Sequence, residues 1–137
     1  MAYNTEVTLL ESATYTATTS AADGSQVAVD TYRRGTFVLD VTAVTGTLAL
    51  DVAIQTYVNG TWSDIARFAQ VTATGERWLW DVGGDVGNSA TIEEATQDLA
   101  ITVSTKRAGP WGQYIRATYT LSTVTSVTFS LKGFVQG

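Results

Sequence analysis

Apolar and polar residues alternate along several segments of the chain. In T-F-V-L-D-V-T-A-V, residues 36–44, every second side chain belongs to one apolar set. The same two-residue period recurs in L-A-L-D-V-A-I-Q-T-Y-V, residues 48–58. Side chains two positions apart lie on one face of a β-strand, so both segments are predicted to be strands with one buried face. The residues expected to face the core are Phe37, Leu39, Val41, Ala43, Leu48, Leu50, Val52, Ile54 and Val58.

Glycine-containing turn signals separate these segments. Thr45-Gly46-Thr47 is predicted to be a turn between the two strands, and residues 72–75 are predicted to form another. Asn59-Gly60 predicts a two-residue type I′ hairpin, because both residues can adopt positive φ. Asn59-Gly60-Thr61 also matches the acceptor pattern for N-glycosylation. The first residues show no secretory leader, so we expect no secretion and interpret the motif as a hairpin.

Further strands are predicted on both sides of this hairpin. They cover residues 6–10, 27–31, 76–80 and 99–105, and a closing hairpin joins 114–121 to 127–135. Residues 81–98 are rich in glycine and acidic residues and are expected to form a long loop with one helical turn at 92–95. Residues 106–110 are expected to form a turn. In the closing hairpin the residues expected to face the core are Ile115, Ala117, Tyr119, Leu121, Val127, Phe129, Leu131 and Val135.

This pattern predicts an all-β fold of about eight or nine strands. No amphipathic helix is available to cover the apolar face of a sheet, so a second sheet has to cover it. We therefore expect an antiparallel two-sheet sandwich, jelly-roll or Ig-like, over residues 27–137. Residues 1–26 are expected to form an N-terminal strand or arm, because 12–26 are small and polar apart from Tyr15.

Composition narrows the possible functions. The 137-residue chain contains no Cys and no His, which excludes disulfides, thiolate metal sites and His-based catalysis. With 8 basic residues, 13 acidic residues and a net charge of −5, we expect neither nucleic-acid nor anionic-membrane binding. No apolar run is long enough to span a bilayer. We expect a protein that is not an enzyme and has no cofactor.

Acidic residues offer two weak alternatives. Asp40 and Asp51 lie on outward faces of neighbouring predicted strands, and Glu93-Glu94 lie in the loop. A glycosidase needs two carboxyl groups roughly 5 to 10 Å apart, but solvated surface acids are the favoured interpretation. Asp81, Asp85 and Asn88 have loosely suitable spacing for Ca²⁺, without an EF-hand pattern. We predict no catalytic residues and no metal site, and leave open whether the 81–98 loop binds an ion or a partner.

Aromatic and basic residues are the best candidates for a contact surface. Trp78 and Trp80 lie two apart on one strand face and form a possible platform. Three alternatives remain open for the tryptophans: core or loop packing, a protein interface, or stacking on a sugar ring. Two pairs of basic residues, Arg33-Arg34 and Lys106-Arg107, each flank a predicted turn. They are either surface charges or groups that pair with an acidic patch on a partner. The candidate partner-contact residues are Tyr15, Arg33, Arg34, Trp78, Trp80, Arg107 and Trp111.

Several segments together resemble a known group of proteins. The segments are G-T-F-V-L-D-V-T-A-V-T-G-T, L-D-V-A-I-Q, N-G-T-W-S-D-I-A-R-F, V-T-A-T-G and G-Q-Y-I-R-A-T-Y-T-L with V-T-F-S-L-K-G-F-V. Over residues 35–135 the chain resembles small β-sandwich structural proteins of tailed bacteriophage virions. The group has no catalytic motif, so the resemblance assigns no functional residue.

The resemblance implies a capsid decoration or auxiliary head protein. Such a protein is made in the host cytoplasm and lies on the capsid surface of the virion. Its partner is the major capsid protein or another virion protein, and it is present as a homo-oligomer or as symmetric copies. The alternatives are a carbohydrate-binding module on a phage head or tail, with a glycan as ligand, and a tail or neck component.

Overall fold

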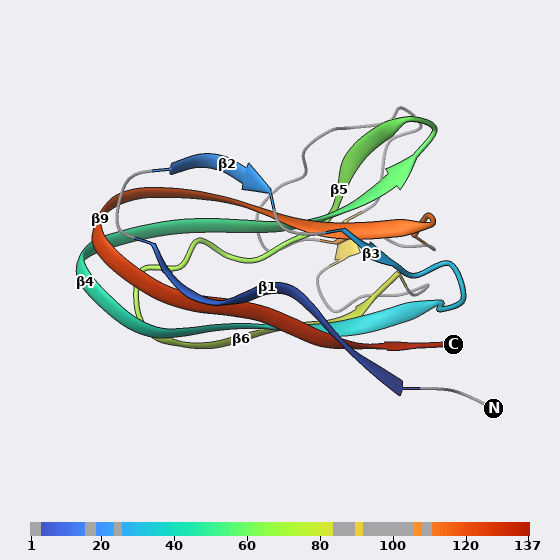
Figure 1. Ribbon diagram of the computed structural model, residues 1–137, viewed down its shortest axis with the longest axis horizontal. Coiled ribbons are helices and arrows are strands. Elements are labelled where there is room, and N and C mark those ends of the chain that lie inside the picture. The colour runs from blue at the N-terminus through green and yellow to red at the C-terminus, as the bar shows by residue number, and fades with distance from the viewer. Residues whose placement is uncertain (1–3, 16–18, 24–25, 84–89, 92–105, 108–110) are drawn as a thin grey trace.

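The computed structural model describes residues 4–15, 19–23, 26–83, 90–91, 106–107 and 111–137. All regular secondary structure in these described residues is β-strand (Figure 1). The all-β prediction is therefore confirmed, and the predicted helical turn at 92–95 lies outside the described residues. The strands are β1 (Asn4–Tyr15), β2 (Thr19–Asp23), β3 (Val27–Ala28), β4 (Arg34–Val58), β5 (Thr61–Arg67), β6 (Gly75–Val82), β7 (Ala90–Thr91), β8 (Lys106–Arg107) and β9 (Tyr114–Gln136).

Two long strands, β4 and β9, form the frame of the fold. They pair antiparallel along their whole length, from Arg34 opposite Gln136 to Thr56 opposite Ile115. Both ribbons change direction together at one end of the molecule (Figure 1). The pairing register shifts around this bend, where Gly46 adopts a φ of 90°. Such irregularities bend a strand and allow the chain to fold back without ending it.

This bend corrects two predictions. Thr45-Gly46-Thr47 is not a turn between two strands but lies inside the 25-residue strand β4. Residues 114–121 and 127–135 do not form a hairpin, because both belong to β9 and pair with opposite halves of β4. In each case a local break in the apolar pattern marks a bend, and the partner strand bends with it.

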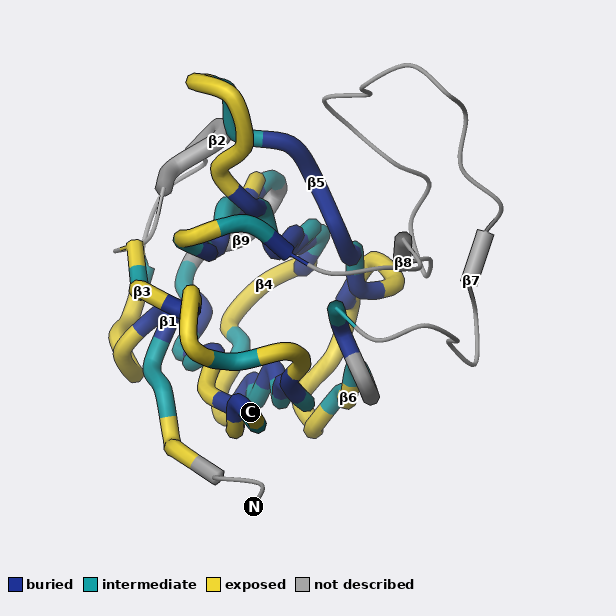
Figure 2. The backbone as a smooth tube through the Cα atoms, turned by 90° about the vertical axis from the view of Figure 1, so that its right-hand side faces the viewer, coloured by how far each residue is buried: buried dark blue, intermediate teal, exposed yellow. Residues whose placement is uncertain are grey.

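All nine strands belong to one hydrogen-bonded sheet. The order is β1-β9-β4-β5-β8-β7, with β6 on β4 and with β2 and β3 on β9. Every pairing is antiparallel except that of β7 with β8. Viewed from the end, this sheet curls around its own interior (Figure 2). The predicted pair of separate sheets is not confirmed, because the bent strands continue from one half of the sheet into the other.

The core lies inside the curl and contains residues from both halves of the sheet. Most of the predicted inward positions are buried, but Ala43 and Val58 are exposed. At Ala43 a register shift after Val41 interrupts the alternation, so Val44 packs against the core instead. Val58 is 47% exposed because it is the last residue before the hairpin. The confirmed core positions are Phe37, Leu39, Val41, Leu48, Leu50, Val52, Ile54, Ile115, Ala117, Tyr119, Leu121, Val127, Phe129, Leu131 and Val135.

The hairpin at Asn59-Gly60 agrees with its prediction. Asn59 has a φ of 52° and Gly60 a φ of 79°, which are the positive values that a type I′ turn requires. Val58 lies opposite Thr61, so the loop contains two residues. The hairpin places the end of β4 beside the start of β5.

The N-terminal region contributes strands to the sheet. Among the described strands β1 pairs with β9 alone, and its Leu9 and Leu10 lie in the core. β2, which precedes residue 26 in the sequence, and β3, which follows it, also pair with β9. The strand predicted at 27–31 is only Val27–Ala28. Of the turn predicted at 106–110, Lys106–Arg107 forms strand β8, and residues 108–110 lie outside the described residues. The strand predicted at 99–105 lies outside the described residues.

Candidate functional site

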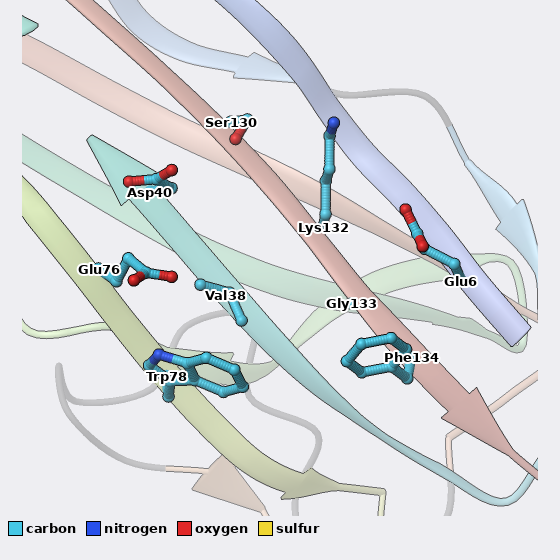
Figure 3. A pocket seen from close by; sticks show the side chains of 9 residues that line it. All are labelled: Glu6, Val38, Asp40, Glu76, Trp78, Ser130, Lys132, Gly133 and Phe134. Atoms are coloured by element: carbon cyan, nitrogen blue, oxygen red, sulfur yellow. The ribbon is translucent and has the colours of Figure 1, made fainter. Parts of the chain in front are cut away.

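A hollow of about 300 Å³ lies on the outer face of the sheet half that contains β1, β9, β4 and β6 (Figure 3). Its position follows from the alternation of the strands. Leu39 and Leu131 face the core, so the residues before and after them face outward. We call this surface the outer hollow. It is lined by Glu6, Val38, Asp40, Glu76, Trp78, Ser130, Lys132, Gly133 and Phe134.

Two large aromatic side chains flank the outer hollow. Trp78 on β6 is 43% exposed, and Phe134 on β9 is 46% exposed. Val38 lies directly opposite Trp78 in the sheet and opposite Lys132 on its other side. Isolated exposed apolar residues are common on proteins, but apolar groups gathered at a concave surface are typical of binding sites.

Charged groups surround the apolar side chains of Val38, Trp78 and Phe134. Asp40 on β4 lies directly opposite Glu76 on β6, and Glu6 on β1 lies opposite Phe134. Lys132 on β9 lies between the strands that carry Glu6 and Asp40 (Figure 3). Three carboxylates and one ammonium group leave an excess of two negative charges. The outer hollow therefore combines exposed rings with a negative charge.

The position of β9 beneath the outer hollow depends on a glycine. Gly133 faces inward between the outward-facing Lys132 and Phe134, and it lies opposite Phe37. A Cβ atom at Gly133 would lie 2.7 Å from Cδ1 of Phe37 and would also meet the carbonyl oxygen of Thr36. Only glycine leaves room for the fully buried Phe37 ring at this point.

A second exposed surface lies at the hairpin, on the other half of β4. Tyr57 and Trp62 are directly opposite each other, and their ring centroids are 5.2 Å apart. The guanidinium carbon of Arg116 lies 4.3 Å from the centroid of the Trp62 ring. This distance is typical of a cation–π interaction. We call these three residues the hairpin cluster.

Hydrogen bonds fix the hairpin cluster on the sheet. Nε of Arg116 donates to Oε1 of Gln55 at 2.9 Å, and Nε2 of Gln55 donates to Oδ1 of Asp64 at 2.9 Å. Asp64 is only 6% exposed. Because the polar groups are paired, this network holds the Arg116 side chain in place over Trp62.

Of the aromatic residues predicted to contact a partner, Trp78 lies in the outer hollow, whereas Tyr15 and Trp111 pack within the fold. Tyr15 stacks on Phe129, with centroids 4.8 Å apart. Trp111 is 8% exposed, and its indole Nε1 donates to the carbonyl oxygens of Val29 and Tyr32 at 3.2 and 3.1 Å. These contacts favour the packing alternative for Trp111.

Among the predicted basic residues that the structure describes, Arg33 and Arg34 do not line the outer hollow. Arg33 and Arg34 are exposed near the end of β9, and Nε of Arg34 donates to Oε1 of Gln136 at 3.3 Å. The side chains of Trp80 and Arg107 lie outside the described residues. Sequence reasoning did not include Phe134, Tyr57 and Arg116 among the candidate contact residues. The alternation in F-S-L-K-G-F-V was enough to place Phe134 outward, two residues after Lys132.

Metal binding finds no support in the part of the chain that the structure describes. There, no group of three or more acidic residues is arranged to hold a metal ion. Asp51 accepts a hydrogen bond from Nε2 of Gln70 at 3.2 Å. Asp85, Asn88, Glu93 and Glu94 lie outside the described residues, as does the side chain of Asp81.

Among the described residues there is also no helix of the length and apolar character needed to cross a membrane.

Comparison with known proteins gives one likeness of fold. No family model and no curated protein sequence matches the chain. Among solved structures, the chain is similar to the crystal structure of the SPBc2 prophage-derived protein YomS. The TM-score is 0.52 at 16% sequence identity, over 100% of this chain and 96% of that chain. At this identity the likeness is one of fold alone.

Proposed function

We propose that the protein is a structural component of a phage virion and, more specifically, a capsid decoration or auxiliary head protein. The observation that carries the proposal is the outer hollow, where Trp78 and Phe134 are exposed on a continuous sheet face. Residues of this kind are enriched at the centres of protein interfaces. The full-length fold likeness to a prophage-derived protein supports a phage origin.

The proposed role needs binding and rigidity rather than chemistry. The protein lies on the capsid surface of the virion, and its partner is the major capsid protein or another virion protein. Each copy buries apolar surface, which contributes roughly 25 cal/mol per Å². Symmetric copies or a homo-oligomer repeat this gain over the particle. No catalytic activity, cofactor or nucleic-acid binding is part of the proposal.

A co-sedimentation assay with capsids that lack the protein tests the role. The variant Trp78→Ala/Phe134→Ala is expected to lose most particle binding, because both aromatic contacts are removed. The matched control is Val58→Ser, which removes an exposed apolar group from the other half of β4. Normal binding of the double variant, or absence of wild-type binding to capsids, contradicts the proposal. Deletion of residues 1–26 is a poor test, because it also removes Leu9 and Leu10 from the core.

A carbohydrate-binding module on a phage head or tail is the second candidate. The observation that favours it is the exposed Trp78 ring beside hydroxyl and carboxylate groups, which suits a stacked sugar with hydrogen bonds. A glycan array distinguishes the two. Retention of a glycan by the wild type, with loss in Trp78→Ala, supports the module, whereas an array without hits removes it. Binding to tails or necks instead of heads would place the protein there as a structural component.

A further inference from the structure

We propose that the outer hollow binds a positively charged side chain of the partner, with an arginine guanidinium as the preferred group. The inference rests on the proposed function, since it names the chemistry of the partner at the same site. Three features carry it: an excess of negative charge, two exposed aromatic rings, and a pair of like charges that face each other across two strands.

The like charges are Asp40 and Glu76. Their strands pair in a register that sets them directly opposite each other. Like charges placed directly opposite each other on paired strands destabilise a sheet. A cation that binds between them removes the repulsion and gains attraction to both carboxylates. Glu6 adds a third carboxylate on the far side of the outer hollow.

The rings supply the second part of the recognition. A guanidinium group is planar and weakly hydrated, and it stacks on aromatic faces as well as pairing with carboxylates. Trp78 lies two residues after Glu76 on β6, and Phe134 lies on β9, across strand β4 from Trp78 (Figure 3). The volume of about 300 Å³ has room for one such side chain. The charge favours a basic segment over an acidic or purely apolar one.

Lys132 is an internal competitor for this site. Its ammonium group belongs to the same lining as the three carboxylates, and it is exposed. An arriving cation has to share the carboxylates with it. Removal of Lys132 is therefore expected to strengthen binding of a cation, whereas loss of an exposed surface charge at an ordinary interface rim changes affinity little.

A titration of the full ¹⁵N-labelled chain tests the inference without any capsid. The probe is N-acetyl-arginine amide, and the matched control is N-acetyl-citrulline amide, which has nearly the same shape without the charge. The indole N–H signal of Trp78, assigned with Trp78→Phe, is expected to shift with the arginine probe and much less with citrulline. The backbone amide signals of the same spectra report whether each variant stays folded.

Two variants are expected to change the affinity for the arginine probe in opposite directions. Asp40→Asn/Glu76→Gln is expected to weaken arginine binding about tenfold, and Lys132→Met to strengthen it about threefold. The inference is overturned if Trp78 fails to respond to arginine, responds equally to citrulline, or if Lys132→Met weakens binding. Capsid co-sedimentation remains a separate measurement. Binding to capsids without a response to arginine would refute the inference alone, and the reverse result would refute the proposed role alone.

Discussion

Replacement of Trp111 by phenylalanine tests the assignment of this residue to the core. Trp111 packs edge-on against Phe37 at a centroid distance of 6.4 Å, and its indole N–H serves two backbone carbonyls. One of them, the Val29 oxygen, also accepts a bond from the backbone N–H of Tyr32. The variant therefore removes the donor mainly from the Tyr32 oxygen and leaves a smaller ring in the same space.

The expected loss is the sum of two effects. A partly buried carbonyl without its donor costs about 1–2 kcal/mol, and the missing ring atoms cost about 1 kcal/mol more. The free energy of unfolding should fall by about 2–3 kcal/mol. With a slope of about 1–3 kcal/mol per molar urea, the midpoint of unfolding should fall by roughly 0.7–3 M.

The control is the same change at Trp78, which is 43% exposed. Trp78→Phe should alter the free energy of unfolding by less than about 0.5 kcal/mol, as is usual for surface positions. Urea unfolding followed by far-ultraviolet circular dichroism measures both variants. Equal midpoints for Trp111→Phe and the wild type would refute the assignment of Trp111 to the core.

Three further predictions concern single positions. Gly133→Ala should cost about 1–3 kcal/mol in unfolding experiments because its Cβ meets Phe37, whereas Gly60→Ala meets no atom and should lose only about 1 kcal/mol through its positive φ. Burial, followed by the charge and hydrogen bond of Tyr15, raises the pKa of Tyr119 above 10.0. The folded state thus resists ionisation, stability should fall as pH rises above about 10, and Tyr119→Phe should reduce that fall. Glu76→Gln should raise the free energy of unfolding in urea by a few tenths of a kcal/mol, because it removes the repulsion with Asp40.

The two-residue period of the sequence predicted most of the buried face. Strands constrain side chains locally, so Phe37, Leu39 and Val41 are placed inward whatever their partner strand is. The period fails at Ala43, where an extra residue in the register reverses the faces. A bulge depends on how β4 pairs with β9, and this long-range pairing cannot be read from a short stretch of sequence.

The bend and the surface were harder to predict for the same reason. T-G-T at residues 45–47 has the composition of a turn, and Gly46 does adopt positive φ. Whether such a glycine makes a hairpin or a bend is decided by the neighbouring strand, and here β9 continues alongside β4. The outer hollow likewise combines residues from β1, β4, β6 and β9, which only the long-range pairing brings together.

The bend also gives the two exposed surfaces a fixed relation. Val38 and Asp40 of the outer hollow precede Gly46 on β4, and Tyr57 of the hairpin cluster follows it. Both halves of β4 pair with one continuous β9 around a common core, so neither surface can turn relative to the other without breaking sheet hydrogen bonds. In the proposed role, this fixed relation would lower the entropy lost if both surfaces are buried against virion proteins.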